Sequence, residues 1–199
     1  MENLEQNIDR RIIRTRHMIY ETFLALMSEK DFVQISVKDI THQANISRST
    51  FYAHYKDKYD LLDKIIEDKL SILNKLLAKS NLPNNAWNNE VADPFFVTYF
   101  ECIAKNYTFY KQMFMIKDPN QFSTKLYHVI RESLSIRFSR IEKERKFSVP
   151  LDILLDYSSS SLLGVTKVWV ENHMIYSPNY IALQFTRLSI NGVYHTMKK

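Results

Sequence analysis

The chain has 199 residues, of which 45% are hydrophobic and 25% charged, and its formal net charge is +5. This composition supplies enough apolar side chain for a packed core and excludes a disordered chain. Gly164 and Gly192 are its only glycines. Tight β-turns and bulges depend on glycine, so we expect a mostly helical fold.

The single cysteine, Cys102, excludes an intramolecular disulfide, and nothing else indicates an oxidising compartment. Residues 1–17 are polar and charged and lack the apolar centre of a signal peptide. No run of about 18 apolar residues is present to cross a membrane. We therefore expect a cytoplasmic protein without a membrane partner.

Helical periodicity predicts four helices before residue 80. The first covers about residues 10–29, with apolar residues along one face. The second opens after Ser36, with Asp39 as the acidic partner in a capping box, and the third opens after Ser47. The fourth begins near Asp57 and extends to about residue 79. Its predicted inward-facing residues are Leu61, Ile65, Ile72 and Leu76.

Residues 80–94 are rich in Asn and Pro and lack a sustained apolar period, which places a domain boundary near residue 80. Beyond it we expect a second group of helices, at about residues 94–106, 107–115, 119–145, 150–172 and 178–191. Asp118-Pro119 and Ser177-Pro178 each place a capping side chain before a proline at the first helical position, and Asn191-Gly192 supplies a stop. The prediction is an all-α fold of about nine helices.

Residues 36–58, SVKDITHQANISRSTFYAHYKDK, carry the most informative pattern. The apolar side chains of Val37, Ile40 and Ala44 share one helix face, Ile46 fills the turn, and Phe51 anchors the next helix. This is the pattern of two short helices that cross around a tight turn, so that the second can enter a DNA major groove. The outer surface of that second helix carries an arginine, which can bind guanine bidentately, and hydroxyl groups, which reach bases or phosphates.

Positive charge is concentrated in the same region. Between Arg10 and Lys58 the chain has nine Lys or Arg against five Asp or Glu, whereas residues 1–80 are nearly balanced at 13 against 12. A local excess of this kind fits a nucleic-acid partner. The four arginines between residues 10 and 16 are either a basic arm along the DNA backbone or an ordinary exposed segment, and the sequence does not decide between these.

The run from Ser36 to Leu62 resembles the DNA-binding domain of the TetR family of bacterial regulators, and the resemblance extends back to Arg10. Its most specific part is the Phe-Tyr-x-His-Tyr-Lys-Asp-Lys run, residues 51–58. The resemblance implies a helix-turn-helix DNA-binding domain over residues 1–56, with a connecting helix at 57–79. It implies an effector-binding and dimerisation domain over residues 80–199. Asn45 stands where many relatives have glycine, and Asn is the residue that best tolerates the positive φ of such a turn.

The resemblance also implies a set of DNA contacts. The implied DNA-binding residues are Ser36, Lys38, Arg48, Ser49, Thr50, Tyr52, His54 and Lys58. The first two fall where the second helix meets the DNA backbone, and the next three fall where the recognition helix touches bases and nearby phosphates. Tyr52 and Lys58 match positions that usually hold phosphates, and His54 lies at the end of the reading surface.

The last two predicted helices suit a dimer interface. Serines 158–161 and Gly164 allow helices to pack closely, and two helices from each subunit can form a four-helix bundle. The interface candidates are Leu155, Leu162, Val165, Trp169, Ile181, Phe185 and Leu188. Residues 157–185 are also similar to the branch of the family associated with dihydroxyacetone kinase operons.

Residues 95–114 are crowded with Phe, Tyr and Met, as in the apolar walls of small-molecule sites. Aromatic residues at helical spacing also form ordinary cores, so both interpretations stay open here. The candidates for an effector pocket are Phe96, Tyr99, Phe100, Tyr107, Tyr110, Met113 and Phe114.

The sequence therefore predicts a transcription regulator, a repressor in our main interpretation. It would bind a palindromic operator in double-stranded DNA as a homodimer, and a small-molecule effector would control it. The alternative is a co-regulator or activator whose C-terminal domain responds to a partner protein. We expect no enzyme, cofactor or metal site. The chain lacks a nucleophile–base arrangement, a glycine-rich phosphate loop and metal-ligand spacing of its histidines.

Overall fold

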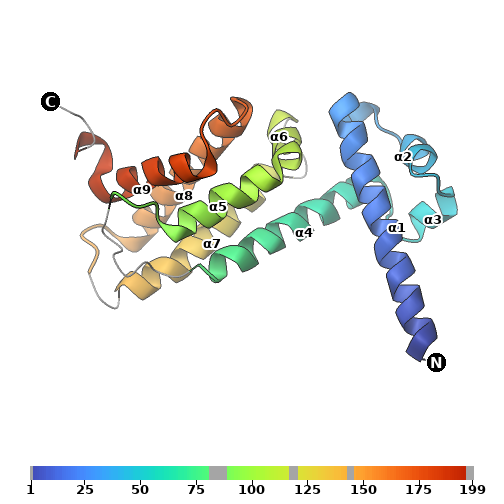
Figure 1. Cartoon of the computed structure of the whole chain (residues 1–199), viewed down its shortest axis with the longest axis horizontal. Helices are drawn as coiled ribbons and strands as arrows, with labels where there is room; N and C mark the ends of the chain where they lie inside the picture. Colours follow the sequence, from blue (N-terminus) through green and yellow to red (C-terminus); the bar gives the residue numbers. More distant parts are fainter. Residues whose placement is uncertain (1, 81–88, 117–120, 143–145, 196–199) are drawn as a thin grey trace. The chain divides into compact units, whose positions relative to one another are not determined.

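The computed structural model describes residues 2–80, 89–116, 121–142 and 146–195 (Figure 1). Over these residues it contains α-helices and one short 3-10 helix and no strand, which confirms the all-α prediction. The elements before residue 80 are α1 (Glu2–Glu29), η1 (Phe32–Gln34), α2 (Val37–Gln43), α3 (Arg48–Tyr52) and α4 (Lys58–Ala78). Those after it are α5 (Pro94–Lys105), α6 (Tyr107–Met115), α7 (Phe122–Glu142), α8 (Leu151–Glu171) and α9 (Pro178–His195). None of the helices in these ranges is long and apolar enough to cross a membrane.

The chain divides into two compact units, residues 1–68 and 69–199, and the division falls inside α4. The first half of this helix therefore belongs to the N-terminal unit and the second half to the C-terminal unit. The division into functional domains near residue 80 stays a prediction.

The N-terminal unit is built around α1. As its periodicity predicts, α1 buries one apolar face, with Ile19 and Phe23 fully inaccessible to solvent. Side chains from the other helices complete this core, including Ile40 of α2, Phe51 of α3 and Leu61 of α4, none of which is exposed. The core thus fixes the two short helices against the long one.

The inward face of α4 differs from the prediction in its second half. Leu61 and Ile65 are buried as expected, but Ile72 is 50% exposed and Leu76 40% exposed. The buried residues there are Leu70, Leu73 and Leu77. The apolar stripe of α4 starts with the adjacent residues Leu61 and Leu62. Because an α-helix has 3.6 residues per turn, the edge that begins at Leu62 stays on the buried face, and the edge that begins at Leu61 turns toward solvent.

In the C-terminal unit α7 packs along α8, and α5 along α9, while α6 contacts α8. Aromatic side chains dominate the core, among them Phe95, Phe109 and Phe122, which are almost completely buried. The predicted Ser177 cap is present, because the Tyr180 amide donates to its hydroxyl at 3.2 Å. The predicted Asp118-Pro119 cap lies outside the described residues.

Several backbone positions have the left-handed conformation that favours glycine. Among the described residues the non-glycine positions with positive φ are Asn45, Gln121, His173 and Met174. The only glycine among the positive-φ positions is Gly192, with φ 67°, near the predicted stop of the last helix. The consecutive pair His173 and Met174 ends α8 after its C-cap, Asn172.

Candidate nucleic-acid interface

The start of α2 is fixed by the predicted capping box. The Asp39 amide donates to the Ser36 hydroxyl oxygen at 3.2 Å, and the Ser36 amide donates to the Asp39 carboxylate at 2.8 Å. The Ser36 hydroxyl also donates to that carboxylate at 2.7 Å, and the Lys30 ammonium lies 3.2 Å away. These bonds, chiefly those from Ser36, lower the pKa of Asp39 to about 2. Asp39 therefore stays ionised and holds the first turn of α2 against the end of α1.

The turn between α2 and α3 has the geometry predicted for Asn45. Asn45 has φ 50°, and its amide donates to the His42 carbonyl at 3.2 Å. The next amide, of Ile46, donates to the Thr41 carbonyl at 3.0 Å. The chain thus reverses tightly without glycine, because Asn tolerates this conformation.

Ser47 caps α3 and gathers the hydroxyl groups beside it. Its Oγ accepts a hydrogen bond from the Thr50 amide at 3.0 Å. It also lies 2.7 Å from the Ser49 Oγ and 2.8 Å from the Thr50 Oγ1. The cap was predicted, but the hydroxyl cluster at the start of the recognition helix was not. The signal available in the sequence was the density of hydroxyl residues around Arg48.

The outer face of α3 carries the side chains that the sequence assigns to DNA. Arg48 and Ser49 are exposed, Thr50 is half-buried, and Tyr52 is 56% exposed. Phe51 is fully buried between them, with its ring edge-on to Tyr52 at a centroid distance of 5.6 Å. The structure thus brings these four side chains together on one short helix, which its buried anchor holds in place.

The remaining DNA-binding candidates are distributed around α3. Ser36 and Lys38 are exposed at the start of α2 in the same compact unit. His54 is half-buried at the end of α3, and its pKa is lowered by burial and by the nearby charges of Arg16 and Lys64. Arg16 is exposed, so this arginine of α1 adds positive charge beside the recognition helix.

Lys58 lies differently from the phosphate contact that the family resemblance implies. Its ammonium donates to the carbonyl oxygens of Phe32, Val33 and Ile35 at 2.8, 2.9 and 2.7 Å. Burial lowers the pKa of Lys58, and the charge of Asp39 acts in the opposite direction. The side chain is thus bound inside the N-terminal unit.

The aromatic residues predicted to line an effector pocket lie in the core of the C-terminal unit. All are buried except Tyr107, which is half-buried and whose hydroxyl lies 3.1 Å from the His173 Nδ1. The Tyr99 hydroxyl lies 3.0 Å from the Thr166 Oγ1, and the Phe100 ring packs edge-on against Trp169. In this conformation the aromatic segment joins α5 to α8 as packed core.

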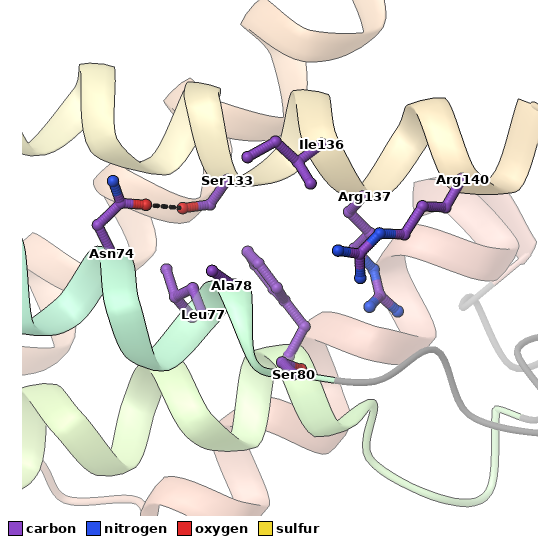
Figure 2. A pocket seen from close by; sticks show the side chains of 9 residues that line it. Asn74, Leu77, Ala78, Ser80, Ser133, Ile136, Arg137 and Arg140 are labelled. Atoms are coloured by element: carbon purple, nitrogen blue, oxygen red, sulfur yellow. Dashed lines mark hydrogen bonds between the residues drawn. The ribbon is translucent and has the colours of Figure 1, made fainter.

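A small cavity opens between α4 and α7 (Figure 2). Its volume is about 10 Å³, close to the smallest space that holds one water molecule. Within it the Ser133 hydroxyl donates to the Asn74 side-chain oxygen at 3.2 Å, as drawn in Figure 2. The cavity is lined by Asn74, Leu77, Ala78, Ser80, Phe95, Ser133, Ile136, Arg137 and Arg140. None of the predicted pocket residues is among them. Ser133, Arg137 and Arg140 are spaced by four and three residues within one predicted helix, so they share one helix face. This polar face was the sequence signal that could have indicated the cavity.

Most of the predicted interface side chains lie inside the subunit. The buried ones are Leu155, Leu162, Trp169, Ile181 and Phe185. They pack against the chain's own helices, so the accessible members of the predicted set are the half-buried Val165 and the 41% exposed Leu188. Nearby, a surface groove of about 330 Å³ has exposed apolar residues on its walls, Val168 at 56% and Ile175 at 70%. Three of the predicted interface residues, Val165, Trp169 and Ile181, also line this groove, whereas Val168 and Ile175 were not predicted, because α8 is apolar on more than one face.

Comparison with known proteins identifies the family. Residues 19–65 match the family model described as bacterial regulatory proteins of the tetR family. Residues 90–191, just over half of the chain, match the model described as a transcriptional regulator C-terminal region. The chain belongs to the TetR family. Regulators of the TetR family bind DNA and typically form dimers and bind small-molecule effectors.

Two similar proteins show how far the sequence similarity extends. The uncharacterized HTH-type transcriptional regulator YxbF of Bacillus subtilis is 40% identical over 81 residues, which cover 40% of this chain and 21% of YxbF. The HTH-type dhaKLM operon transcriptional activator DhaS of Lactococcus lactis is 32% identical over 110 residues, 55% of this chain and 54% of DhaS. The matched region thus spans about a fifth of one relative and about half of the other.

Among solved structures, a TetR transcriptional regulator from Streptococcus agalactiae superposes with a TM-score of 0.64. The two chains are 24% identical, and the match covers 94% of this chain and 98% of the other. This comparison supports the fold, which therefore extends over nearly the whole chain.

Proposed function

We propose that the protein is a cytoplasmic, sequence-specific DNA-binding regulator that binds a palindromic operator as a homodimer. The carrying observation is the outer face of α3, where Arg48, Ser49, Thr50 and Tyr52 lie together above the buried Phe51. A short helix with this arrangement in a TetR-family chain is suited to the major groove.

Each side chain of this face has a distinct role in the proposal. Arg48 recognises a base, because a guanidinium binds guanine bidentately. Ser49 and Thr50 reach bases or nearby phosphates when their bonds to Ser47 rearrange. The Tyr52 hydroxyl and the Lys38 ammonium hold phosphates, with Ser36 at the start of α2 and His54 at the end of α3 beside them.

The homodimer brings two recognition helices to the two halves of one operator. The exposed apolar residues Val168 and Ile175 beside the groove on α8 support a partner on this side. Such residues are costly to leave in water, and a second copy of the chain covers them.

The effector acts in this proposal by favouring one of two conformations. The aromatic candidates of α5 and α6 are packed as core, so in this proposal an effector of metabolite size binds when that core opens. Repression is our main proposal. Activation is the second candidate, because the protein with 32% identity over 110 residues, DhaS, is named an activator.

The test is binding of the purified protein to the intergenic DNA beside its own gene, across a series of salt concentrations. We expect tight binding that competitor DNA does not remove. Lys38→Ala lowers affinity for all sequences and reduces the salt slope by about one, and Tyr52→Ala lowers affinity for all sequences. Arg48→Ala reduces the preference for the specific site by about 1–3 kcal/mol.

The matched control is Lys105→Ala, which removes an exposed lysine at the end of α5 in the other compact unit. It should leave affinity and salt slope as in the wild type. Equal effects of Lys105→Ala and Lys38→Ala would contradict the proposed interface. Transcription in vitro from the bound promoter then separates repression from activation.

A further inference from the structure

The ammonium of Lys58 reaches from the first residue of α4 to the 3-10 helix η1. Its three hydrogen-bond acceptors are the carbonyl oxygens of Phe32, Val33 and Ile35, which lie 23 to 26 residues earlier in the chain. An ammonium group has three donors. Three bonds of 2.7 to 2.9 Å therefore use the full hydrogen-bonding capacity of this side chain.

Two aromatic rings complete the surroundings of this ammonium. It lies 4.7 Å from the ring centroid of Phe32 and 5.4 Å from that of Tyr59. The two rings pack edge-on at 5.2 Å, and Phe32 packs edge-on against Phe23 of α1 at 6.1 Å. Carbonyl oxygens and ring faces both attract a cation. The site thus joins η1 to α4 and, through Phe23, to α1.

Ile35, the residue after η1, connects the Lys58 site to the start of α2. Ile35, whose carbonyl binds Lys58, is 1% exposed and directly precedes Ser36, the N-cap of α2. Lys30 at the end of α1 also pairs with Asp39 in the first turn of α2 at 3.2 Å. Two lysines therefore contact the segment in which α2 begins.

We propose that Lys58 is a positioning residue: its ammonium clasps the carbonyls of η1 and thereby fixes the start of α2 for DNA binding. The predicted effect on DNA binding rests on the proposed function, whereas the bonds between Lys58 and the carbonyls rest on the geometry described above. It assigns to Lys58 a role other than contact with a phosphate. A phosphate contact requires that the ammonium give up at least one of its three carbonyl bonds.

The first test compares the reactivity of two lysines in the wild-type protein toward an acetylating N-hydroxysuccinimide ester, read by mass spectrometry. Lys38 is exposed and Lys58 half-buried. In the free protein we expect acetylation of Lys58 to be slower than that of Lys38 by about tenfold or more, because its three bonds must open first. Addition of the intergenic DNA should protect Lys38 and leave the slow rate of Lys58 unchanged. Fast labelling of Lys58 in free protein, with protection only in the complex, would overturn the clasp.

The second test uses Lys58→Met, which keeps an unbranched apolar side chain beside the rings and removes the donors. We expect affinity for the intergenic DNA to fall about tenfold with the salt slope of the wild type. Lys38→Ala serves as the reference for a lost phosphate contact. Amide hydrogen exchange should become faster in η1 and the first turn of α2 but not in α5 of the other unit.

The outcomes separate the two proposals. A salt slope that falls by about one in Lys58→Met would assign the residue to a phosphate and overturn the inference. Unchanged affinity together with unchanged exchange would also overturn it. Failure of the wild-type protein to bind its DNA would contradict the proposed function. The acetylation rate of Lys58 and the amide exchange of the free protein would still test whether Lys58 binds the carbonyls.

Discussion

The carboxylate of Asp93 accepts a hydrogen bond from the guanidinium of Arg137, and the two side chains are only 11% and 9% exposed. The same aspartate caps α5, since its other oxygen accepts from the Phe95 amide at 2.8 Å. Its own amide donates to the Thr186 Oγ1 of α9 at 2.9 Å. Burial raises the pKa of Asp93, and the charge of Arg137 opposes that shift. One residue therefore connects α5, α7 and α9.

Arg137→Met should destabilise the protein by about 3 kcal/mol, because it leaves the buried carboxylate without its charged partner. Urea unfolding measures this change. The control is Arg131→Met, which breaks the exposed pair with Asp156 at 2.7 Å and should cost less than about 1 kcal/mol. Equal losses of unfolding free energy in the two variants would show that the buried pair contributes no more to stability than the exposed pair.

Asp39→Asn should reduce the acid sensitivity of the N-terminal unit. The pKa of Asp39 is lowered from 3.8 to about 2, first by the hydrogen bonds from Ser36 and then by Lys30. A lowered folded-state pKa contributes stability that is complete above the unfolded-state pKa and is lost as the pH falls from about 4 to about 2. The variant should therefore be less stable than the wild type at pH 7 and differ less from it at pH 2.

Thermal unfolding at several pH values measures this difference. Glu29→Gln, which removes an exposed carboxylate of α1, is the matched control and should leave the pH dependence of the wild type intact. An Asp39→Asn protein with a wild-type pH profile would contradict the assigned role.

Ser47→Ala should destabilise the protein by about 1 kcal/mol, the usual cost of a lost N-cap. Ser47→Asn keeps a capping oxygen and should recover most of this stability. It lacks the hydroxyl that lies 2.7 Å from Ser49 and 2.8 Å from Thr50. If the hydroxyl cluster orients these side chains for DNA, the Asn variant should be stable but bind DNA less tightly than the wild type. If Ser47→Asn binds DNA as tightly as the wild type, the role of Ser47 is to cap α3 and not to orient Ser49 and Thr50.

The buried pair Tyr99 and Thr166 should respond asymmetrically to removal of either partner. The Thr166 hydroxyl has a second bond, to the Leu162 carbonyl at 2.7 Å, so Tyr99→Phe leaves it satisfied and should cost about 1 kcal/mol or less. Thr166→Val leaves the fully buried Tyr99 hydroxyl without this partner and should cost about 2 kcal/mol. Chemical denaturation of both single variants and the double variant gives the coupling. Equal costs would contradict the asymmetry.

The features that the sequence predicted well are those with short-range causes. A cap depends on residues three positions apart, so the Ser36 and Ser47 caps were visible in the sequence. The left-handed Asn45 followed from the conformational tolerance of one side chain. The overall fold was predictable for the same reason, because each helix carries its own periodicity and its own ends.

The features that escaped prediction depend on contacts between distant segments. The bonds of Lys58 reach carbonyls 23 to 26 residues away, and carbonyl positions leave no trace in residue types. On α8 both Leu162, which is buried, and Val168, which is 56% exposed, are apolar. Hydrophobicity alone therefore could not separate the subunit core from its outer surface.

The left-handed backbone positions have a consequence for engineering. Four residues that have a Cβ atom adopt the left-handed conformation, which glycine adopts without steric cost: Asn45, Gln121, His173 and Met174. Each costs on the order of 1 kcal/mol, least for Asn. Glycine at Gln121 or Met174 would relieve this steric cost and offset it by the larger backbone entropy that glycine loses on folding, whereas glycine at His173 would also remove the hydrogen bond to Tyr107.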